Sequence, residues 1–204
     1  MTQKILLDLF CCAGGAARGY QQAGFYVVGV DIKPQPHYVG DEFFQGDALD
    51  FGRRYGKDFY AIHASPPCQG YSEETRKEYR GNHQKLIAPT RDLLKRSGAH
   101  YVIENVKGAR FDLVDPFILC GSMFGLKVFR HRYFETSFYT GLTSPCNHNF
   151  KPVYITGTRW KDGKKCDDLI ADKKAACGID WMIMTELDEA IPPAYTRWIG
   201  ERIP

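Results

Sequence analysis

The sequence predicts an α/β fold with a mostly parallel sheet and helices on both of its faces. Continuous apolar runs of strand length, rich in Val, Ile, Phe and Tyr, alternate with helical or polar stretches through the first half of the chain. Such runs are typical of parallel strands that are buried on both sides. A glycine-rich turn directly after the first run and polar residues at the ends of the later runs agree with this fold. The runs are residues 4–10, 26–32, 59–65 and 100–106.

Bulk composition limits the class of protein. A chain of 204 residues suits one domain with a small insertion, and 44% hydrophobic residues support a folded core. Because no apolar run approaches the ~20 residues of a membrane helix and Met1 starts no signal-peptide pattern, we expect a soluble, cytoplasmic monomer without a membrane partner. Seven cysteines, an odd number, indicate reduced thiols. The net charge of +3 is compatible with a nucleic-acid partner but does not require one.

One helix and two further strands are predicted in addition to the four apolar runs. Between the last two apolar runs, residues 83–98 have leucines at helical spacing and end on Gly98, a common helix terminator. Beyond the last run, residues 117–126 and 127–136 predict two further strands, the second with alternating character.

The second half is more polar. Residues 157–165 show no periodicity and predict a loop. Thr185 is placed to cap a short helix over residues 184–191, and Pro193 suits the first turn of a last helix.

The turn after the first run has features of a nucleotide site. Gly14 and Gly15 let the backbone approach a ligand closely. Asp31 ends the second run, where a carboxylate commonly binds ribose hydroxyls, and Asp47 ends the next short run. Since the turn lacks a phosphate-binding lysine, S-adenosylmethionine fits better than ATP or NAD. The alternative is that Asp31 and Asp47 only cap or end strands.

Further polar groups converge on the same edge of the predicted sheet. Two prolines hold Cys68 on a stiff loop. Glu104 lies inside an apolar run, where a carboxylate needs an oppositely charged or hydrogen-bonding partner or has a functional role. Arg130 and Arg132 are two apart, so on a strand they share one face. Because these groups converge on one edge of the sheet, they predict a catalytic or binding site there. The alternatives are a buried packing cysteine, a structural salt bridge and a solvated pair of arginines.

The order of the motifs resembles that of the DNA cytosine-5 methyltransferases. The matching segments are DLF…GG…AGF, VGVDI, GDAL, SPPCQGYS, VIENV, RHRYFE and AIPPAYTRWIG. The resemblance implies a class I S-adenosylmethionine-dependent methyltransferase fold, Rossmann-like, that acts on double-stranded DNA. It divides the chain into a catalytic, cofactor-binding domain at 1–139, a very small target-recognition insert at 140–179 and a C-terminal segment at 180–204 that completes the catalytic domain.

The resemblance implies the roles of four residues. Cys68 would add to carbon 6 of a flipped cytosine and thereby make carbon 5 nucleophilic, which requires nearby cations to lower the pKa of the thiol. Glu104 would hold or protonate ring nitrogen 3 and grip the exocyclic amine. Arg132 would contact the carbonyl oxygen of the base, and Arg130 would support it or bind phosphate.

Binding residues follow from the same resemblance. Those for S-adenosylmethionine are Phe10, Ala13, Gly14, Gly15, Asp31, Ile32, Asp47 and Pro67. Those for DNA, in a loop that closes over the flipped base, are Gln69, Tyr71, Ser72, Arg76, Lys77 and Arg80. In the insert they are Arg159 and Lys161, for which a solvated loop is the alternative.

Four departures from the family pattern stand out. Cys12 occupies a usual glycine position, Ile32 an often aromatic one and Val128 a usual glutamine position, while Asp188-Glu189 replaces Gly-Asn before the last Pro-Pro pair. The short insert predicts a short or relaxed recognition site, as in compact phage or prophage enzymes.

Other possibilities remain open from the sequence. Four residues of the second half could bind zinc, but their spacing matches no standard finger and we predict no metal site. They are Cys146, His148, Cys166 and Cys177. The rival functions are an RNA cytosine-5 methyltransferase, a non-catalytic DNA-binding module of the same fold, and a cysteine hydrolase with His63 as its base.

Overall fold

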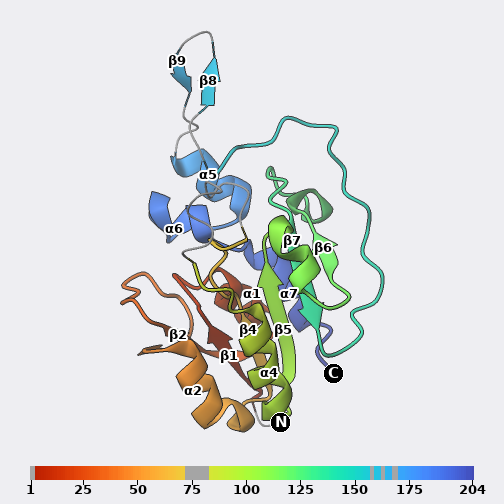
Figure 1. The fold of residues 1–204 in the computed structure, drawn as a ribbon. Helices are drawn as coiled ribbons and strands as arrows, with labels where there is room; N and C mark the ends of the chain where they lie inside the picture. Colours follow the sequence, from red (N-terminus) through yellow and green to blue (C-terminus); the bar gives the residue numbers. More distant parts are fainter. Residues whose placement is uncertain (1–2, 72–82, 157–158, 162–163, 167–169) are drawn as a thin grey trace.

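One mixed sheet forms the centre of the molecule (Figure 1). The computed structural model describes residues 3–71, 83–156, 159–161, 164–166 and 170–204. The sheet's strands are β1 Ile5–Leu9, β2 Tyr26–Asp31, β3 Glu42–Gln45, β4 Ala61–Ala64, β5 His100–Asn105, β6 Phe117–Leu119 and β7 Arg132–Thr136. Their order is β3-β2-β1-β4-β5-β7-β6. The pairs from β3 to β5 are parallel, whereas β7 is antiparallel to β5 and β6.

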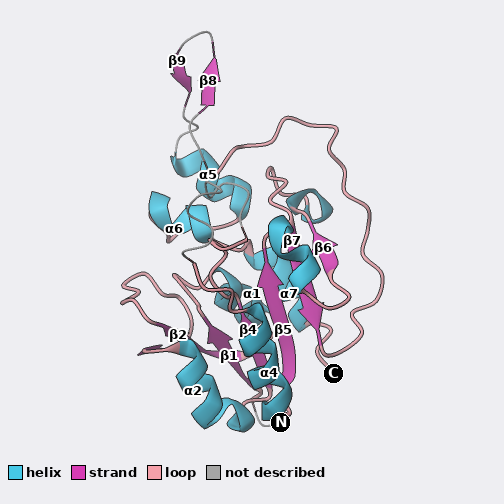
Figure 2. Cartoon of the chain, viewed as in Figure 1, coloured by secondary structure: helices cyan, strands magenta, loops and turns pink. Residues whose placement is uncertain are grey.

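Helices cover both faces of this sheet (Figure 2). They are α2 Ala48–Tyr55 and α4 Ile87–Ser97 on one face and α1 Gly15–Gln22 and α7 Pro193–Gly200 on the other. Successive residues of a strand point to opposite faces. Leu7 of β1 accordingly joins the apolar cluster of Leu93, while Leu6 joins that of Tyr20 and Ile199. The predicted α/β fold with helices on both faces is confirmed.

The first half of the chain follows the sequence prediction closely. The four apolar runs form β1, β2, β4 and β5. The predicted helix over residues 83–98 is α4, and Gly98 follows it with φ 74°, a left-handed conformation that glycine adopts without strain.

The two strands predicted over residues 117–126 and 127–136 are largely wrong. Only Phe117–Leu119 and Arg132–Thr136 pair in the sheet. Between them the chain makes a 3-10 turn, Gly125 has φ 72° and Arg130 has φ 31°. Left-handed residues break an extended run, and local alternation does not reveal them.

Two further local predictions are corrected. Residues 157–165, predicted as a loop, overlap the antiparallel hairpin of β8 Arg159–Lys161 and β9 Lys164–Cys166. Strands of three residues are too short to show a period in the sequence. Thr185 does not cap a helix, because α6 Met184–Glu189 already starts at Met184. The Ile183 amide, just before that helix, instead donates to Glu186 Oε2 at 2.9 Å.

The second half adds a small third apolar cluster above the turn that follows β1. Between β7 and the hairpin, residues 137–156 contain no helix or strand, and we call this segment the strap. Ile155 of the strap packs with Cys177 of α5 Ile170–Cys177 and with Leu187 of α6. No helix among the described residues is long and apolar enough to cross a membrane.

The last helix returns to the first. Thr196 of α7 donates to the Ala16 carbonyl of α1 at 2.8 Å. A Cβ at Gly19 would collide with the Pro193 carbonyl oxygen and the Arg197 amide nitrogen, so α7 approaches α1 through a glycine. Residues near the C-terminus therefore complete the layer that covers β1.

Candidate active site

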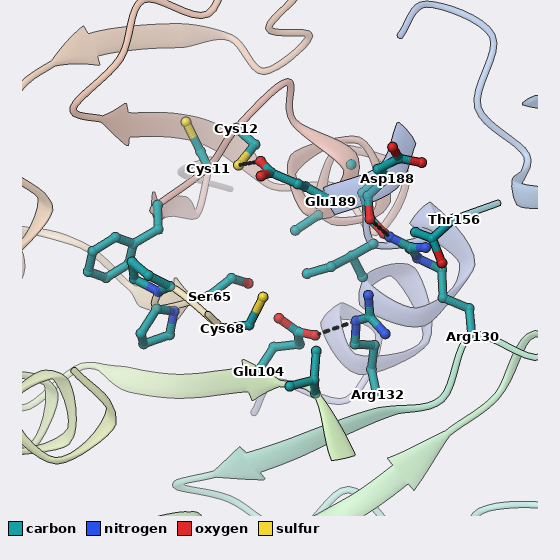
Figure 3. A pocket seen from close by; sticks show the side chains of 18 of the residues that line it. Cys11, Cys12, Ser65, Cys68, Glu104, Arg130, Arg132, Thr156, Asp188 and Glu189 are labelled. Atoms are coloured by element: carbon teal, nitrogen blue, oxygen red, sulfur yellow. Dashed lines mark hydrogen bonds and ion pairs between the residues drawn. The ribbon is translucent and has the colours of Figure 1, made fainter. Parts of the chain in front are cut away.

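A cavity of about 740 Å³ opens at the carboxyl ends of the parallel strands (Figure 3). This is the edge at which open α/β sheets bind ligands. Most of the predicted catalytic and cofactor residues line it: Phe10, Gly15, Asp31, Ile32, Asp47, Pro67, Cys68, Glu104, Arg130 and Arg132. Of the predicted turn residues, Ala13 and Gly14 are not part of this lining. Ala13 is buried, and its carbonyl accepts from the Trp181 indole at 2.9 Å.

The loop that carries Cys68 is held from a neighbouring strand. Asn105, at the end of β5, donates through Nδ2 to the Pro66 carbonyl at 2.8 Å and is fully buried. The Tyr71 amide closes a turn on the Cys68 carbonyl at 2.9 Å. Prolines restrict the backbone on one side of Cys68 and this turn restricts it on the other. The thiol is therefore presented to the cavity on a stiff loop.

Glu104 lies beside the thiol and forms an ion pair. Its Oε1 is 3.0 Å from Arg132 Nε at the start of β7, and the carboxylate is only 5% exposed. Burial raises the pKa of Glu104, while Arg132 and a hydrogen bond from Ser65 act in the opposite direction. A carboxyl group with a raised pKa can hold or deliver a proton nearer to neutral pH.

The pKa of Cys68 departs from the sequence expectation. Burial raises the pKa of the thiol, and the carboxylates of Glu104 and Glu189 raise it further, whereas Arg132 lowers it. The sequence-based expectation of a lowered thiol pKa took only the nearby cations into account. The fold brings two carboxylates to the same place, so in this structure the thiol is harder to ionise.

The turn after β1 has an unusual backbone. Phe10 and Cys12 have φ 60° and 44°, and Gly14 has φ 83°. Non-glycine residues in the left-handed region are costly and occur preferentially at functional sites. Cys12 therefore stands where glycine would be relaxed, which agrees with its being a departure from the family pattern.

Two of the departures touch each other. Cys12 Sγ is 3.6 Å from Glu189 Oε2, the contact drawn in Figure 3. Burial, the Asp31 carboxylate and this contact raise the pKa of Cys12, so the thiol is the donor. The thiol that replaces glycine thus faces the carboxylate that replaces asparagine.

The two cofactor carboxylates differ in their surroundings. Asp31 accepts from the Cys12 amide through Oδ2 and from the Lys33 amide through Oδ1, both at 3.0 Å. Asp47 caps α2, since its Oδ1 accepts from the Asp50 amide at 2.7 Å. Asp31 therefore shapes the turn, and Asp47 caps a helix with one of its two oxygens.

The prediction that Arg130 and Arg132 share a face of one strand is wrong. Arg130 precedes β7 and donates to the carbonyl oxygens of Ala190 at 2.6 Å and Asp188 at 2.7 Å. Its left-handed backbone turns its side chain away from the Glu104 pair and toward the chain after α6. Arg130 thus holds the last motif against the cavity, while Arg132 pairs with Glu104.

The predicted DNA contacts lie only partly in the described chain. Gln69 lines the cavity. Tyr71 is buried in the core, with 5% of the residue exposed, and its hydroxyl accepts from the Ile87 amide at 3.4 Å, so this structure does not present it to a ligand surface. Ser72, Arg76, Lys77 and Arg80 lie outside the described residues. Arg159 and Lys161 belong to strand β8, and their side chains lie outside the description.

Asp8 of β1 is a cavity residue that the sequence reasoning missed. Its carboxylate is 1% exposed, and neither oxygen has a hydrogen-bond partner among the described groups. Burial and the neighbouring Asp31 raise its pKa. A charged residue inside the first apolar run was the available signal.

His63 is not placed as a base for Cys68. Its Nδ1 is 3.0 Å from the Tyr20 hydroxyl and its Nε2 is 2.9 Å from Ser65 Oγ. The ring is fully buried, and burial lowers its pKa to about 3. This geometry argues against the cysteine hydrolase alternative.

Comparisons with known proteins identify the family of the chain. The family model for C-5 cytosine-specific DNA methylases matches residues 5–111. The type II methyltransferase M.XorII of Xanthomonas oryzae pv. oryzae is 32% identical over an alignment of 125 residues, and the match covers 53% of this chain and 29% of that protein. The match thus spans less than a third of the length of this relative.

A solved structure matches the whole chain. The methyltransferase EhMeth of Entamoeba histolytica superposes with a TM-score of 0.67 over 100% of this chain and 98% of that one, at 12% identity. At this identity the likeness concerns the fold.

Proposed function

Because the chain belongs to the C-5 cytosine-specific DNA methylases, we propose that it transfers a methyl group from S-adenosylmethionine to carbon 5 of a cytosine in double-stranded DNA. The observation that carries the proposal is the meeting of Cys68, the Glu104–Arg132 pair and Asp31 in one cavity. Nucleophile, acid and cofactor-binding groups thus lie within reach of one bound base.

The reaction assigns one step to each group. The Cys68 thiolate forms a bond to carbon 6, and Glu104 stabilises the charge that moves to ring nitrogen 3. Carbon 5 then takes the methyl group from the sulfonium of the donor. A base, for which water that enters the cavity is available, then takes the proton from carbon 5; its electron pair forms the carbon 5–carbon 6 double bond, and the carbon 6–sulfur bond breaks to release the Cys68 thiolate. Arg132 holds Glu104 and lies where it can donate to the carbonyl oxygen of the base.

The residues of the turn suit this donor. Each oxygen of Asp31 accepts one amide and has a second lone pair for a ribose hydroxyl. Asp47 uses Oδ1 for the helix cap, so its Oδ2 remains for the adenine amine. Phe10 and Ile32 add apolar surface beside them.

We assign target reading to the insert at 140–179 and expect a short recognition sequence, as in compact prophage enzymes. The hairpin β8–β9 stands clear of the sheet beyond α5 in Figure 1, which supports a role in contacting DNA. Residues 180–204 complete the domain of residues 1–139 through the packing of α7 on α1.

The test is trapping on DNA that contains 5-fluorocytosine. Fluorine replaces the proton that must leave, so the enzyme should stay covalently bound when S-adenosylmethionine is present. Cys68→Ser should abolish the adduct, whereas Cys177→Ala, a change in the insert core, should keep it. DNA with ordinary cytosine is the second control.

Other outcomes separate the rival functions. Cofactor binding without an adduct on any DNA, together with an adduct on 5-fluorocytosine RNA, would establish the RNA enzyme instead. Neither cofactor binding nor an adduct on either substrate, in a folded protein, would favour the non-catalytic module.

A further inference from the structure

Four potential metal ligands meet beside β6 and β7. They are Cys120, His131, Cys146 and His148, and their ligand atoms all lie within 4.8 Å of one another. Cys120 directly follows β6, His131 directly precedes β7, and the other two belong to the strap. Three segments that are separate in sequence thus contribute to one cluster.

The distances within the cluster suit a tetrahedral ion. Cys120 Sγ is 3.4 Å from His148 Nε2, and Cys146 Sγ is 3.6 Å from His131 Nε2. Zinc binds sulfur at about 2.3 Å and imidazole nitrogen at about 2.0–2.1 Å, so a sulfur–nitrogen edge of a tetrahedron measures about 3.6 Å. Both pairs agree with that edge.

Neighbouring groups orient the ligands. The Phe129 ring stacks on the His148 ring with centroids 4.0 Å apart. Ser122 Oγ lies 3.1 Å from Cys120 Sγ and accepts from the Asn147 amide at 3.1 Å, between the two strap ligands. Outer contacts of this kind are usual around bound metals, because they hold the first ligands in place.

A metal bound at this cluster would stabilise the strap. Residues 137–156 form a segment of a compact domain without a helix or strand, longer than most such connections. Small or loop-rich regions are commonly stabilised by a metal or a disulfide. A metal here would tie the strap to the ends of β6 and β7.

We propose that Cys120, His131, Cys146 and His148 bind one structural Zn²⁺. Two thiolates and two imidazoles in tetrahedral arrangement favour zinc over magnesium or calcium, and four protein ligands close the site to water. The ion fixes His131, which lies between Arg130 and Arg132 in the sequence. The zinc site therefore positions the two arginines of the cavity without contacting the substrate.

This set differs from the one that the sequence suggested. Cys146 and His148 belong to both sets, but Cys177 is buried with Ile155 and Leu187 in the third apolar cluster. The side chain of Cys166 lies outside the description. Among the described residues, the structure brings Cys146 and His148 together with Cys120 and His131, from outside the insert.

The experiment measures metal in the whole protein, purified under reducing conditions from cells grown with zinc. We expect one zinc per chain by elemental and native mass spectrometry. Co²⁺ in its place should give the visible absorption of a tetrahedral thiolate site. Cys146→Ser and His148→Ala should each lower zinc affinity at least tenfold. Cys177→Ala, from the sequence-based set, should retain one zinc.

Three results would overturn the proposal. One is a wild-type protein, folded by near-ultraviolet circular dichroism, that holds less than a tenth of a zinc per chain and takes up none from added Zn²⁺. Another is a disulfide between Cys120 and Cys146, found by peptide mapping in a second sample that is lysed without reductant and with its free thiols blocked at lysis. The third is full zinc retention in the Cys146→Ser/His148→Ala double variant.

Discussion

Cys68 illustrates how neighbouring residues decide the chemistry of one side chain. Its thiol needs to ionise before it can attack a base, yet burial and the carboxylates of Glu104 and Glu189 oppose ionisation. Arg132 alone favours the thiolate among these groups. In the protein without ligands the surroundings of Cys68 therefore oppose formation of the thiolate, whereas the positive sulfonium of a bound donor would favour it.

The pH dependence of Cys68 alkylation tests this electrostatic balance. In the protein without ligands, the midpoint of iodoacetamide alkylation should lie above that of an ordinary cysteine thiol. Glu104→Gln should lower the midpoint, because it removes a negative charge and leaves Arg132 unpaired, and alkylation at pH 7 should become several-fold faster. Peptide mass spectrometry follows the modified residue, with Cys68→Ser to identify it. A wild-type midpoint below the ordinary value would contradict the balance described.

At the scale of elements, the site depends on contacts between segments that are distant in sequence. Asn105 of β5 holds the Cys68 loop, and Arg130 holds the chain after α6. α7 packs on α1 directly beside the turn after β1, with Gly19 at the point of closest approach. The last helix is thus part of the support of the cofactor turn.

Gly19→Ala should destabilise the fold. The new Cβ would overlap the backbone of Pro193 and Arg197, and α7 would have to shift, so we expect a loss of about 1–3 kcal/mol in the free energy of unfolding. Gly46→Ala is the matched control, since no atom lies within 4 Å of its Cβ, and it should change stability by less than about 0.5 kcal/mol. Urea unfolding measures both. Equal effects of the two substitutions would rule out the close α1–α7 contact as the cause.

At the scale of the whole molecule, the sheet edge and the second half enclose one cavity. The third apolar cluster, with Ile155 and Leu187, seats the strap, α5 and α6 above the turn after β1. The hairpin β8–β9 extends beyond them (Figure 1). The proposed contact between the hairpin and DNA would thus lie outside the cavity that holds Cys68 and Glu104.

Arg159→Ala/Lys161→Ala in the hairpin should weaken DNA binding without changing S-adenosylmethionine affinity. If both cations contact phosphates, the slope of log affinity against log salt should fall by about 2. Lys57→Ala/Lys95→Ala, a change of two exposed lysines near α2 and α4, is the control and should leave the slope unchanged. Fluorescence anisotropy over a salt series measures the effect. An unchanged slope in the hairpin variant would remove the hairpin from the proposed DNA interface.

The sequence by itself determined the sheet's parallel strands, the helix before β5 and several of the residues that line the cavity, such as Asp31, Cys68 and Glu104. These features depend on local signals: apolar runs, glycine turns, and polar groups such as Asp31, Cys68 and Glu104 at strand ends. Parallel strands bring their carboxyl ends to one edge, so residues predicted separately had to meet there.

Only the tertiary structure decided which groups touch. It separated Arg130 from Arg132, paired Cys12 with Glu189 and brought Cys120 and His131 to the strap residues Cys146 and His148. It also raised, rather than lowered, the pKa of Cys68. Each of these depends on the distance between residues that are far apart in the chain or on a left-handed backbone at one residue. Electrostatic energies and metal geometry vary with such distances, and the periodicity and composition of a sequence do not reveal these distances.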